Sequence, residues 1–490
     1  MASVIVIGAG LSGLAAAAHL TRDGHEVTVL ERASTPGGRA AFFDAEGYHI
    51  DLGPTVLTMT DLLADAFHAT GATMEDYLEI APVDPMYRAT FSDGSVLRVL
   101  HGRDAMTEEI RSVCGNVDAR AFGRFCDWLE QLYNVELPHF IDANFNSPLD
   151  LMRTPAALIS LLRLGGLQRL SRKVAEFFAD ERLQRVFSFQ SMYAGLAPYE
   201  ALAVYAVITY MDSVRGVSFP KGGMGRIGVA LAEACEKAGV QFQYDTNVER
   251  ILRTPSGAVS GVRLASGENV AAEIVVCSAD LPVAYRELLG TEPPLVARRG
   301  RYSPSCVVWG AGVRGALPEH TAHHNIFFGD QWNDAFRALL RDGTRMPDPS
   351  ILVTVPTLGD PTLAPPGGHV LYVLEPVPNL SGRIDWTRQR DSIKADIEAR
   401  VGALGFPTEV VTERFIDPLD WESQGMAMGT PFALAHRFFQ SGPFRPNNVT
   451  RKVPGLVFTG SGTVPGVGVP MVLISGKLAA QRVAQYAGMR

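Results

Sequence analysis

The chain has 490 residues, of which 47% are hydrophobic, with 48 glycines and 31 prolines. This length allows two or three domains, and the composition excludes a disordered or fibrous protein. The net charge of −8, with basic residues interspersed, gives no support for a nucleic-acid partner. The five cysteines are dispersed and indicate a reducing compartment.

No signal peptide precedes the first predicted strand, and no apolar stretch reaches the roughly 18 residues that cross a bilayer. The best candidate, 201–211, is too short. We therefore expect a cytoplasmic protein that is not integral to a membrane.

The first forty residues carry the pattern of a dinucleotide-binding βαβ unit. A β-branched run at 4–7 leads into Gly8, Gly10 and Gly13, then an alanine-rich helix, and a second strand at 27–30 ends at Glu31. Gly8 permits the turn, Gly10 lets backbone approach a pyrophosphate and Gly13 lets the helix pack on the strand. The pyrophosphate would lie at the helix N-terminus, and Glu31 would accept hydrogen bonds from the ribose. This unit alone allows NAD or FAD.

A loop and a turn after the second strand favour FAD. Gly37-Gly38-Arg39 follows Glu31-Arg32, and 48–55 contains Asp51 and the turn Gly53-Pro54-Thr55. Flavoproteins place such a Gly-Gly-Arg loop against the cofactor. The combination resembles the glutathione-reductase-type FAD-binding Rossmann fold of the flavin amine oxidase and phytoene desaturase superfamily. It implies an α/β protein with an inserted α+β substrate domain.

The sequence pattern of the middle of the chain, residues 91–440, indicates three structural regions. Residues 91–217 are mostly helical by pattern, including helices at 122–133 and 150–170. Residues 218–300 return to the nucleotide domain through a helix at 225–238, a strand at 240–244 and a β meander, with Val248 beside the adenine and Asp280 ending a strand. Residues 301–440 alternate strands and loops, as in a mixed sheet over a substrate cavity. We therefore expect a discontinuous FAD domain of 1–90, 218–300 and 441–490.

The last fifty residues predict a second cofactor contact. A strand at 455–459 enters the glycine-rich loop 460–471, and a helix follows from about Pro470 to Tyr486. The N-terminus of this helix would face the flavin, where its dipole stabilises negative charge. A plain loop before a surface helix is the alternative interpretation.

Over nearly its whole length the chain resembles the FAD-dependent carotenoid desaturase family, bacterial phytoene desaturase type. The most specific stretches are 51–56, 187–193, 219–223, 372–378, 442–446 and 460–471. The resemblance implies desaturation of 15-cis-phytoene towards lycopene, with hydride transfer from an allylic carbon to flavin N5 and with quinone or oxygen as electron acceptor. Together with the motifs it implies FAD contacts from the following residues: Gly8, Gly10, Gly13, Glu31, Arg32, Gly38, Arg39, Gly53, Pro54, Thr55, Val248, Asp280, Gly462, Thr463, Gly466, Val469, Pro470 and Met471.

Asp150 and Arg153 are the candidate catalytic pair. They stand three residues apart in the stretch aligned with the family's proposed acid-base region, and an exposed helical ion pair is the alternative. A substrate without polar groups needs an apolar tunnel. Aromatic residues that could supply its walls are Phe187, Phe189, Tyr193, Phe438 and Phe439.

Contact with a membrane is expected, because phytoene resides in lipid. The 150–170 segment can lie in a headgroup layer or pack as an ordinary core helix. An oligomer is possible. No metal site is expected, since His323-His324 has no second ligand pair at suitable spacing.

Three other functions stay open. The first is a related carotenoid oxidoreductase: an isomerase, a ketolase, or a hydroxyneurosporene or diapophytoene desaturase. The second is an amine oxidase, although no cysteine follows Cys306 to anchor FAD covalently. The third is a prenyl-lipid escort protein on the same fold, whose nucleotide motif would be eroded, whereas Gly8, Gly10, Gly13 and Glu31 are intact.

Overall fold

A five-stranded parallel sheet carries the first βαβ unit in the computed structural model, which describes residues 1–488. The strand order is β19-β13-β1-β2-β9, so the N-terminal strand lies at the centre. These strands are β1 (Ser3–Ile7), β2 (Glu26–Leu30), β9 (Gln241–Gln243), β13 (Ile274–Cys277) and β19 (Leu456–Phe458). Three segments that are distant in sequence therefore build one sheet.

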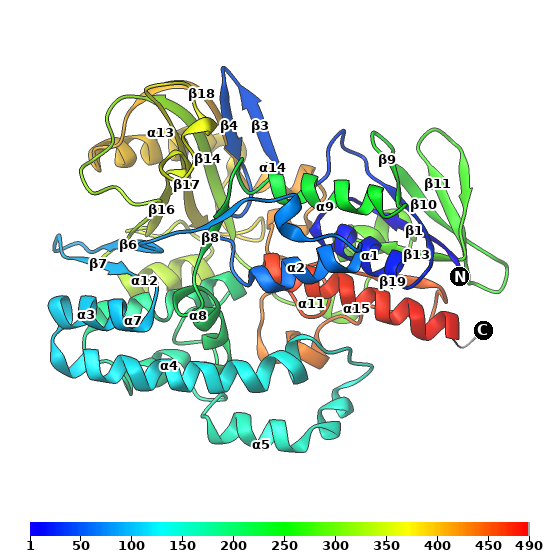
Figure 1. Ribbon diagram of the computed structural model, residues 1–490, viewed down its shortest axis with the longest axis horizontal. Helices are drawn as coiled ribbons and strands as arrows, with labels where there is room; N and C mark the ends of the chain where they lie inside the picture. Colours follow the sequence, from blue (N-terminus) through cyan, green and yellow to red (C-terminus); the bar gives the residue numbers. More distant parts are fainter. Residues whose placement is uncertain (489–490) are drawn as a thin grey trace.

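Helices cover one face of this sheet and a β meander covers the other. The alanines of α1 (Leu11–Arg22) pack in one core with Val4 and Val6 of β1. Ile5 and Ile7 point to the opposite face and pack with the meander of β10 (Val248–Arg253), β11 (Val259–Leu264) and β12 (Asn269–Ala271). The other helices of the layer are α2 (Thr60–Ala69), α9 (Arg226–Lys237) and α15 (Val469–Gly488), and α15 lies alongside α1 (Figure 1).

The second large sheet is a mixed sheet of seven strands in the order β18-β14-β17-β16-β15-β6-β7. Its strands are β6 (Tyr87–Thr90), β7 (Val96–Val99), β14 (Ser305–Arg314), β15 (His324–Phe327), β16 (Ile351–Thr354), β17 (Gly368–Val377) and β18 (Glu409–Ile416). The hairpin β6–β7 joins this sheet through a parallel pairing of β6 with β15. The expected domain boundary at residues 90 and 91 therefore falls inside a hairpin of the substrate-domain sheet.

The expectation of only strands and loops over 301–440 is incomplete, because α13 (Trp386–Ala403) lies within it. Trp386, Ile393, Ile397 and Val401 pack its apolar side on one face of the seven-stranded sheet. The remaining residues of this helix are largely polar, so its apolar stripe is narrow.

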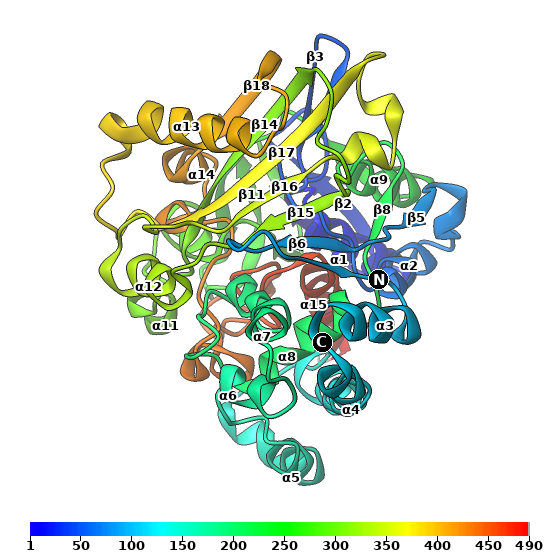
Figure 2. The ribbon, with the colours of Figure 1, turned by 90° about the vertical axis from the view of Figure 1, so that its left-hand side faces the viewer.

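The helical region lies below both sheets (Figures 1 and 2). It contains α3 (Arg103–Cys114), α4 (Asn116–Glu136), a π-helical turn η2 (Leu137–Ile141), α5 (Pro155–Arg163), α6 (Leu170–Ala175), α7 (Glu181–Val186) and α8 (Ala206–Ser213). The helix expected over 150–170, with an interruption at Gly165-Gly166, is divided further in the structure. The chain forms the short 3-10 helix η3 (Pro148–Arg153), then α5, then a turn at Gly165 with φ 74°. Proline at 155 and glycine at 165 and 166 explain the interruptions.

Short elements complete the chain. They are the hairpin β3 (Phe42–Ala45) and β4 (Tyr48–Asp51), the pair β5 (Ile80–Pro82) and β8 (Ser218–Pro220), and the helices α10 (Leu281–Val283), α11 (Leu295–Arg299), α12 (Trp332–Arg337) and α14 (Pro418–Ser423). Within residues 1–488, no helix has the length and apolarity that a bilayer crossing requires.

Candidate active site

One cavity of about 990 Å³ runs between the nucleotide sheet, the seven-stranded sheet and the helical region. Its walls include the glycine loop after β1, the N-terminus of α15 and leucines of α5. A dinucleotide site and an apolar chamber are therefore continuous in this molecule.

The glycine motif opens the first end of the cavity. Gly8 has φ 95°, and a Cβ on Gly13 would lie 2.1 Å from the Gly8 carbonyl oxygen, so α1 packs on β1 without room for a side chain. A Cβ on Gly38 would lie 2.9 Å from the Gly10 Cα. Both Gly10 and Gly38 line the cavity, and the N-terminus of α1 has no side-chain cap. The arrangement leaves backbone N–H groups for an anion.

Glu31 ends β2 at the wall of the cavity, as expected. Its Oε2 accepts from the Ala9 N–H at 2.6 Å and its Oε1 accepts from the Ala33 N–H at 2.9 Å. Each carboxylate oxygen retains capacity for a further hydrogen bond, such as one from a ribose hydroxyl.

Arg39 connects the three segments of the nucleotide domain. Its Nη2 donates to Asp280 Oδ2 at 3.2 Å and its Nη1 donates to Ser461 Oγ. Asp280 follows β13 and Ser461 follows β19, so the guanidinium joins the ends of two strands to the Gly37-Gly38-Arg39 loop. Arg32 likewise donates to the Gln424 carbonyl.

Two buried groups hold the turn 53–55 in place. Asp51 accepts from the Met224 and Gly225 N–H groups at 2.7 and 2.8 Å. His324 Nε2 lies 3.0 Å from the Thr55 carbonyl oxygen, and burial lowers the pKa of His324 to about 4, which keeps the ring neutral. Sequence analysis missed this role of His324.

The N-terminus of α15 closes the other end of the dinucleotide site. Val469, Pro470 and Met471 line the cavity. Gly476, one and a half turns on, meets α1 so closely that a Cβ would lie 2.6 Å from the Ser12 carbonyl oxygen. The two helix N-termini are thus fixed against each other.

Fifteen of the eighteen expected cofactor contacts line the cavity, and Gly13, Thr463 and Gly466 do not. Gly13 serves helix packing. Thr463 is buried and donates from Oγ1 to the Pro446 carbonyl at 2.8 Å, and Gly466 lies against the His436 ring. Whether the lining residues contact FAD stays a prediction.

Asp150 and Arg153 lie outside the cavity wall. Asp150 Oδ2 accepts from the Asn146 and Ser147 N–H groups at 2.6 and 3.3 Å, and these hydrogen bonds hold its pKa below the usual value. Arg153 is exposed and lies 3.1 Å from Asp150. Asp150 and Arg153 thus form the ion pair that was the alternative interpretation. An acid-base role for the two residues stays a prediction.

Two buried carboxyl groups that sequence analysis missed do line the cavity: Glu136 at the end of α4 and Asp212 on α8. Asp212 accepts hydrogen bonds from Tyr87 at 3.2 Å and Gln190 at 3.3 Å, and burial raises its pKa to about 7. Glu136 Oε1 has no hydrogen-bond partner. The spacing in the sequence could have indicated the burial of Glu136, because Leu129, Leu132 and Glu136 fall on one face of an amphipathic helix.

The expected aromatic walls divide into three groups. Tyr193 and Phe438 line the cavity. Phe187 and Phe189 are core residues, and Phe439 is 70% exposed at the surface. Leu151, Leu158, Leu161 and Leu167 also line the cavity, together with aromatic residues that were not expected, among them Tyr205, Phe432 and Phe444.

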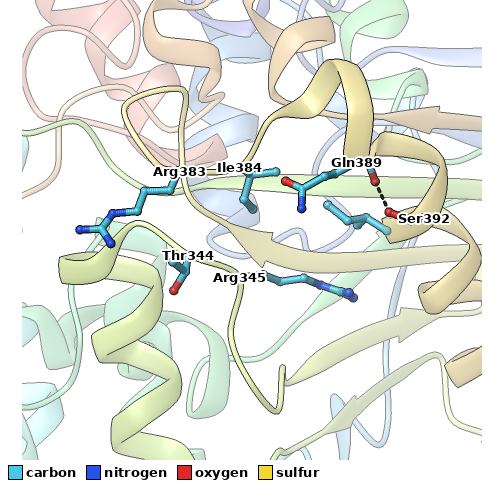
Figure 3. Close-up of a pocket in the computed structure, with 7 residues that line it drawn as sticks. Thr344, Arg345, Arg383, Ile384, Gln389 and Ser392 are labelled. Carbon is cyan, nitrogen blue, oxygen red and sulfur yellow. Dashed lines mark hydrogen bonds between the residues drawn. The ribbon is translucent and has the colours of Figure 1, made fainter.

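A second pocket, of about 320 Å³, lies on the seven-stranded-sheet domain (Figure 3). It shares no residue with the main cavity. Arg345, one of the two arginines that line it, lies 2.6 Å from Glu375 and 2.7 Å from Asp396, so its charge is neutralised. Across residues 1–488, no group of three or more His, Cys, Asp or Glu residues could hold a metal ion.

Comparison with known proteins agrees with this geometry. Residues 11–484 match the model of the family described as flavin containing amine oxidoreductase. The chain belongs to this family. It is 47% identical to a phytoene dehydrogenase of Streptomyces griseus over 98% of this chain and 94% of that protein. It is 37% identical to a zeta-carotene-forming phytoene desaturase of Myxococcus xanthus over 99% and 94%.

The fold is shared with solved structures of low identity. An oxidoreductase from Methanosarcina mazei matches with a TM-score of 0.61 at 18% identity, over 99% of this chain and 100% of that chain. The resemblance to the phytoene desaturases, the fold class and the assignment as an FAD-dependent oxidoreductase are confirmed. Two features fit the cofactor. The N-terminus of α1 has no side-chain cap, so its N–H groups are left for a pyrophosphate, and Gly10 and Gly38 lie close together without side chains that would fill the space.

Proposed function

We propose that this flavoenzyme desaturates phytoene, or a closely related linear carotene, in carotenoid biosynthesis. The observation that carries the proposal is the continuity of the cavity from the N-terminus of α15 to the leucines of α5. A polyene hydrocarbon offers only apolar surface, and burying that surface supplies about 25 cal/mol per Å². The names of the Streptomyces griseus and Myxococcus xanthus relatives support the same substrate class.

In this reaction the residues of the chain bind and orient the cofactor and the substrate. FAD, when bound, accepts a hydride from a substrate carbon. Gly10, Gly38 and the N-terminus of α1 would hold its pyrophosphate, and Glu31 its ribose. Pro470 and Met471 would place the start of α15 beside its reactive end, where the helix dipole favours negative charge. The apolar walls exclude water from the reacting carbons.

An exposed apolar patch supports collection of the substrate from a membrane. The patch comprises Leu149, Met152, Ile159, Leu162, Leu167, Phe438 and Phe439, which are 43–76% exposed. The rings of Phe438 and Phe439 contact Phe444, and its turn lies against η3, so the two parts of the patch are neighbours. Leu167 and Phe438 also line the cavity. Figure 2 shows α5 at the outer edge of the helical region.

Basic residues are frequent in the stretch of sequence that carries most of this patch. Arg153, Arg163, Arg169, Arg172 and Lys173 stand in residues 148–173, where Asp150 is the acidic residue. An apolar surface on a basic stretch of sequence matches an anionic lipid headgroup layer. We expect flotation with phosphatidylglycerol-containing liposomes, and we expect Leu149→Glu with Met152→Glu to lose it. Flotation of the double variant at the level of the unaltered protein would contradict this surface.

Asp150 and Arg153 remain proposed participants near the substrate entrance, and quinone or oxygen the proposed acceptor. Turnover with added quinone but without oxygen, compared with oxygen alone, separates the two acceptors. Normal turnover by both Asp150→Asn and Arg153→Ala would remove the pair from the mechanism.

The test of the function is expression in a phytoene-accumulating bacterial host, with pigments separated by chromatography. The expected products are carotenes with more conjugated double bonds than phytoene. Unchanged phytoene in cells that contain the FAD-loaded protein would overturn the proposal. A product that differs only in double-bond geometry would indicate an isomerase.

A further inference from the structure

Glu136 is a carboxyl group in a hydrocarbon environment. It ends α4, is 6% exposed and lines the main cavity. Its Oε1 is buried without a hydrogen-bond partner. Buried polar atoms almost always have such partners, and an unpaired one costs stability. A position of this kind needs an explanation other than folding.

The neighbours of Glu136 place it near the start of α15. Tyr133, one turn earlier, packs with Val207 and Met211 of α8. Leu137 and Ile141, which follow it, pack against the same group, and so does Met471 at the start of α15. The carboxyl group therefore lies where the apolar chamber meets the expected reactive end of the cofactor.

Titratable side chains also stand on the elements that pack near Glu136, and Tyr205 is the one whose pKa the Glu136 charge affects. Tyr205 is close enough for the Glu136 charge to add to the effect of burial in raising the pKa of the Tyr205 hydroxyl, although that hydroxyl hydrogen-bonds to Ser441 and the His436 carbonyl. Tyr133 on α4 bonds to Arg215. Lys477 of α15 is paired with Asp142 at 2.7 Å. The two cations named here, Arg215 and Lys477, therefore contact Tyr133 and Asp142 and not Glu136.

We propose that Glu136 is the base that accepts the proton lost from the substrate during desaturation, an inference that rests on the proposed function. Burial alone raises the pKa of Glu136 well above its usual value of 4.5. A carboxylate of raised pKa is a stronger base than an exposed one, which suits it to removing a carbon-bound proton.

The step balances as follows. One C–H bond of the substrate breaks and its hydrogen leaves with both electrons to FAD. The C–H bond on the adjacent carbon breaks and its proton bonds to the Glu136 carboxylate, while the electron pair of that bond forms the new C=C bond. The substrate is oxidised by two electrons, and FAD is reduced by two. The proton passes from Glu136 to water after the product has left the cavity.

Asp280 and Asp212 are competing buried carboxyl groups of the cavity. Asp280 is paired with Arg39 at 3.2 Å, so a cation neutralises its charge although its Oδ1 accepts no hydrogen bond. Asp212 accepts hydrogen bonds from Tyr87, Gln190 and Ser213, so its oxygens are occupied by donors. Glu136 is free of such donors among the described residues, and we therefore prefer it.

The test is anaerobic mixing of the FAD-loaded protein with phytoene in detergent micelles, with flavin absorbance as the readout. In the unaltered protein, the rate of bleaching should rise with pH through a midpoint well above 4.5, since only the carboxylate accepts a proton. Glu136→Gln should bind FAD normally, lower the rate about 100-fold or more and remove that pH dependence. Glu136→Asp should recover part of the rate. Glu130→Gln, an exposed position on the same helix, should behave as the unaltered protein.

A second readout does not depend on turnover. The infrared spectrum of the apoprotein at neutral pH should contain the carbonyl band of a protonated carboxylic acid that Glu136→Gln removes and Glu130→Gln keeps. Glu136→Gln should also unfold at about the same temperature, because the protonated carboxyl group and the amide that replaces it are both uncharged and similar in shape.

Bleaching by Glu136→Gln at the unaltered rate would overturn the role of Glu136 while leaving the desaturase function intact. If Glu136→Gln does not fold, Glu136→Met, which suits the apolar surroundings, carries the same comparison. Failure of the unaltered protein to bleach would instead remove the proposed function.

Discussion

Arg39 Nη2 lies 3.2 Å from Asp280 Oδ2, although 241 residues separate the two in sequence. The contact joins the loop after β2 to the end of β13 inside the nucleotide domain. Asp280 is almost fully buried, so its charge depends on this guanidinium for compensation.

Substitution Arg39→Leu should therefore weaken FAD binding at least tenfold, because it leaves Asp280 uncompensated and releases Ser461. Flavin fluorescence titration of the apoprotein measures the affinity. Arg388→Leu on α13, where the arginine is 85% exposed, is the control and should bind FAD normally. Equal affinities for the two variants would show that Arg39 does not support the cofactor site.

Gly10 and Gly13 should respond differently to substitution. A Cβ on Gly10 would lie 3.8 Å from the nearest protein atom, the Gly38 Cα, so Gly10→Val should change the free energy of unfolding of the apoprotein by about 1 kcal/mol while blocking FAD. A Cβ on Gly13 overlaps the Gly8 carbonyl oxygen, so Gly13→Ala should destabilise even the apoprotein, by about 1–3 kcal/mol. Urea unfolding with and without FAD separates the two effects. Yellow Gly10→Val protein with full activity would refute the pyrophosphate assignment.

The Asp212 carboxyl group should make stability fall as the pH rises from about 4 to about 7. Burial raises its pKa from 3.8 to about 7, so the folded state holds a proton in this window that the unfolded state has lost. The contribution is complete below pH 3.8 and disappears as pH passes through about 7. The free energy of unfolding, measured with urea across this range, should depend less steeply on pH in Asp212→Asn than in the unaltered protein. Identical slopes would mean that Asp212 ionises normally.

Gly476→Ala should separate α15 from α1. Its Cβ would lie 2.6 Å from the Ser12 carbonyl oxygen and 2.7 Å from the Ala15 Cβ. We expect a lower unfolding temperature and weaker FAD binding, measured by flavin release during thermal unfolding. Gly488→Ala on the same helix meets nothing within 4 Å and should be neutral or slightly stabilising. Comparable unfolding temperatures for both variants would contradict a tight contact.

The sequence was most informative where function depends on local backbone. Gly8, Gly10 and Gly13 are needed within one turn, so their spacing reveals the unit without tertiary information. Glu136 and Asp212 acquire their properties from burial between elements that are distant in sequence, and a carboxyl residue on a helix gives no sign of this. The parallel pairing of β6 with β15 is equally non-local.

The helical region shows a different limit. The leucines of 150–170 predicted a helix interrupted at Gly165-Gly166, and the structure divides it again at Pro155. In α13 the apolar residues recur at 386, 393, 397 and 401, which is a helical spacing, but the dense charges between them masked the pattern.

The contact of Gly476 with α1 joins two helices that are synthesised at different times. The helix that begins beside Gly10 leaves the ribosome well before α15 does, because more than 400 residues separate them. A nascent chain can therefore form the adenosine half of the site but not the half that positions the reactive ring. Complete flavin binding therefore has to wait for α15, and we expect a chain truncated before residue 469 to accumulate as apoprotein however much FAD the cell supplies.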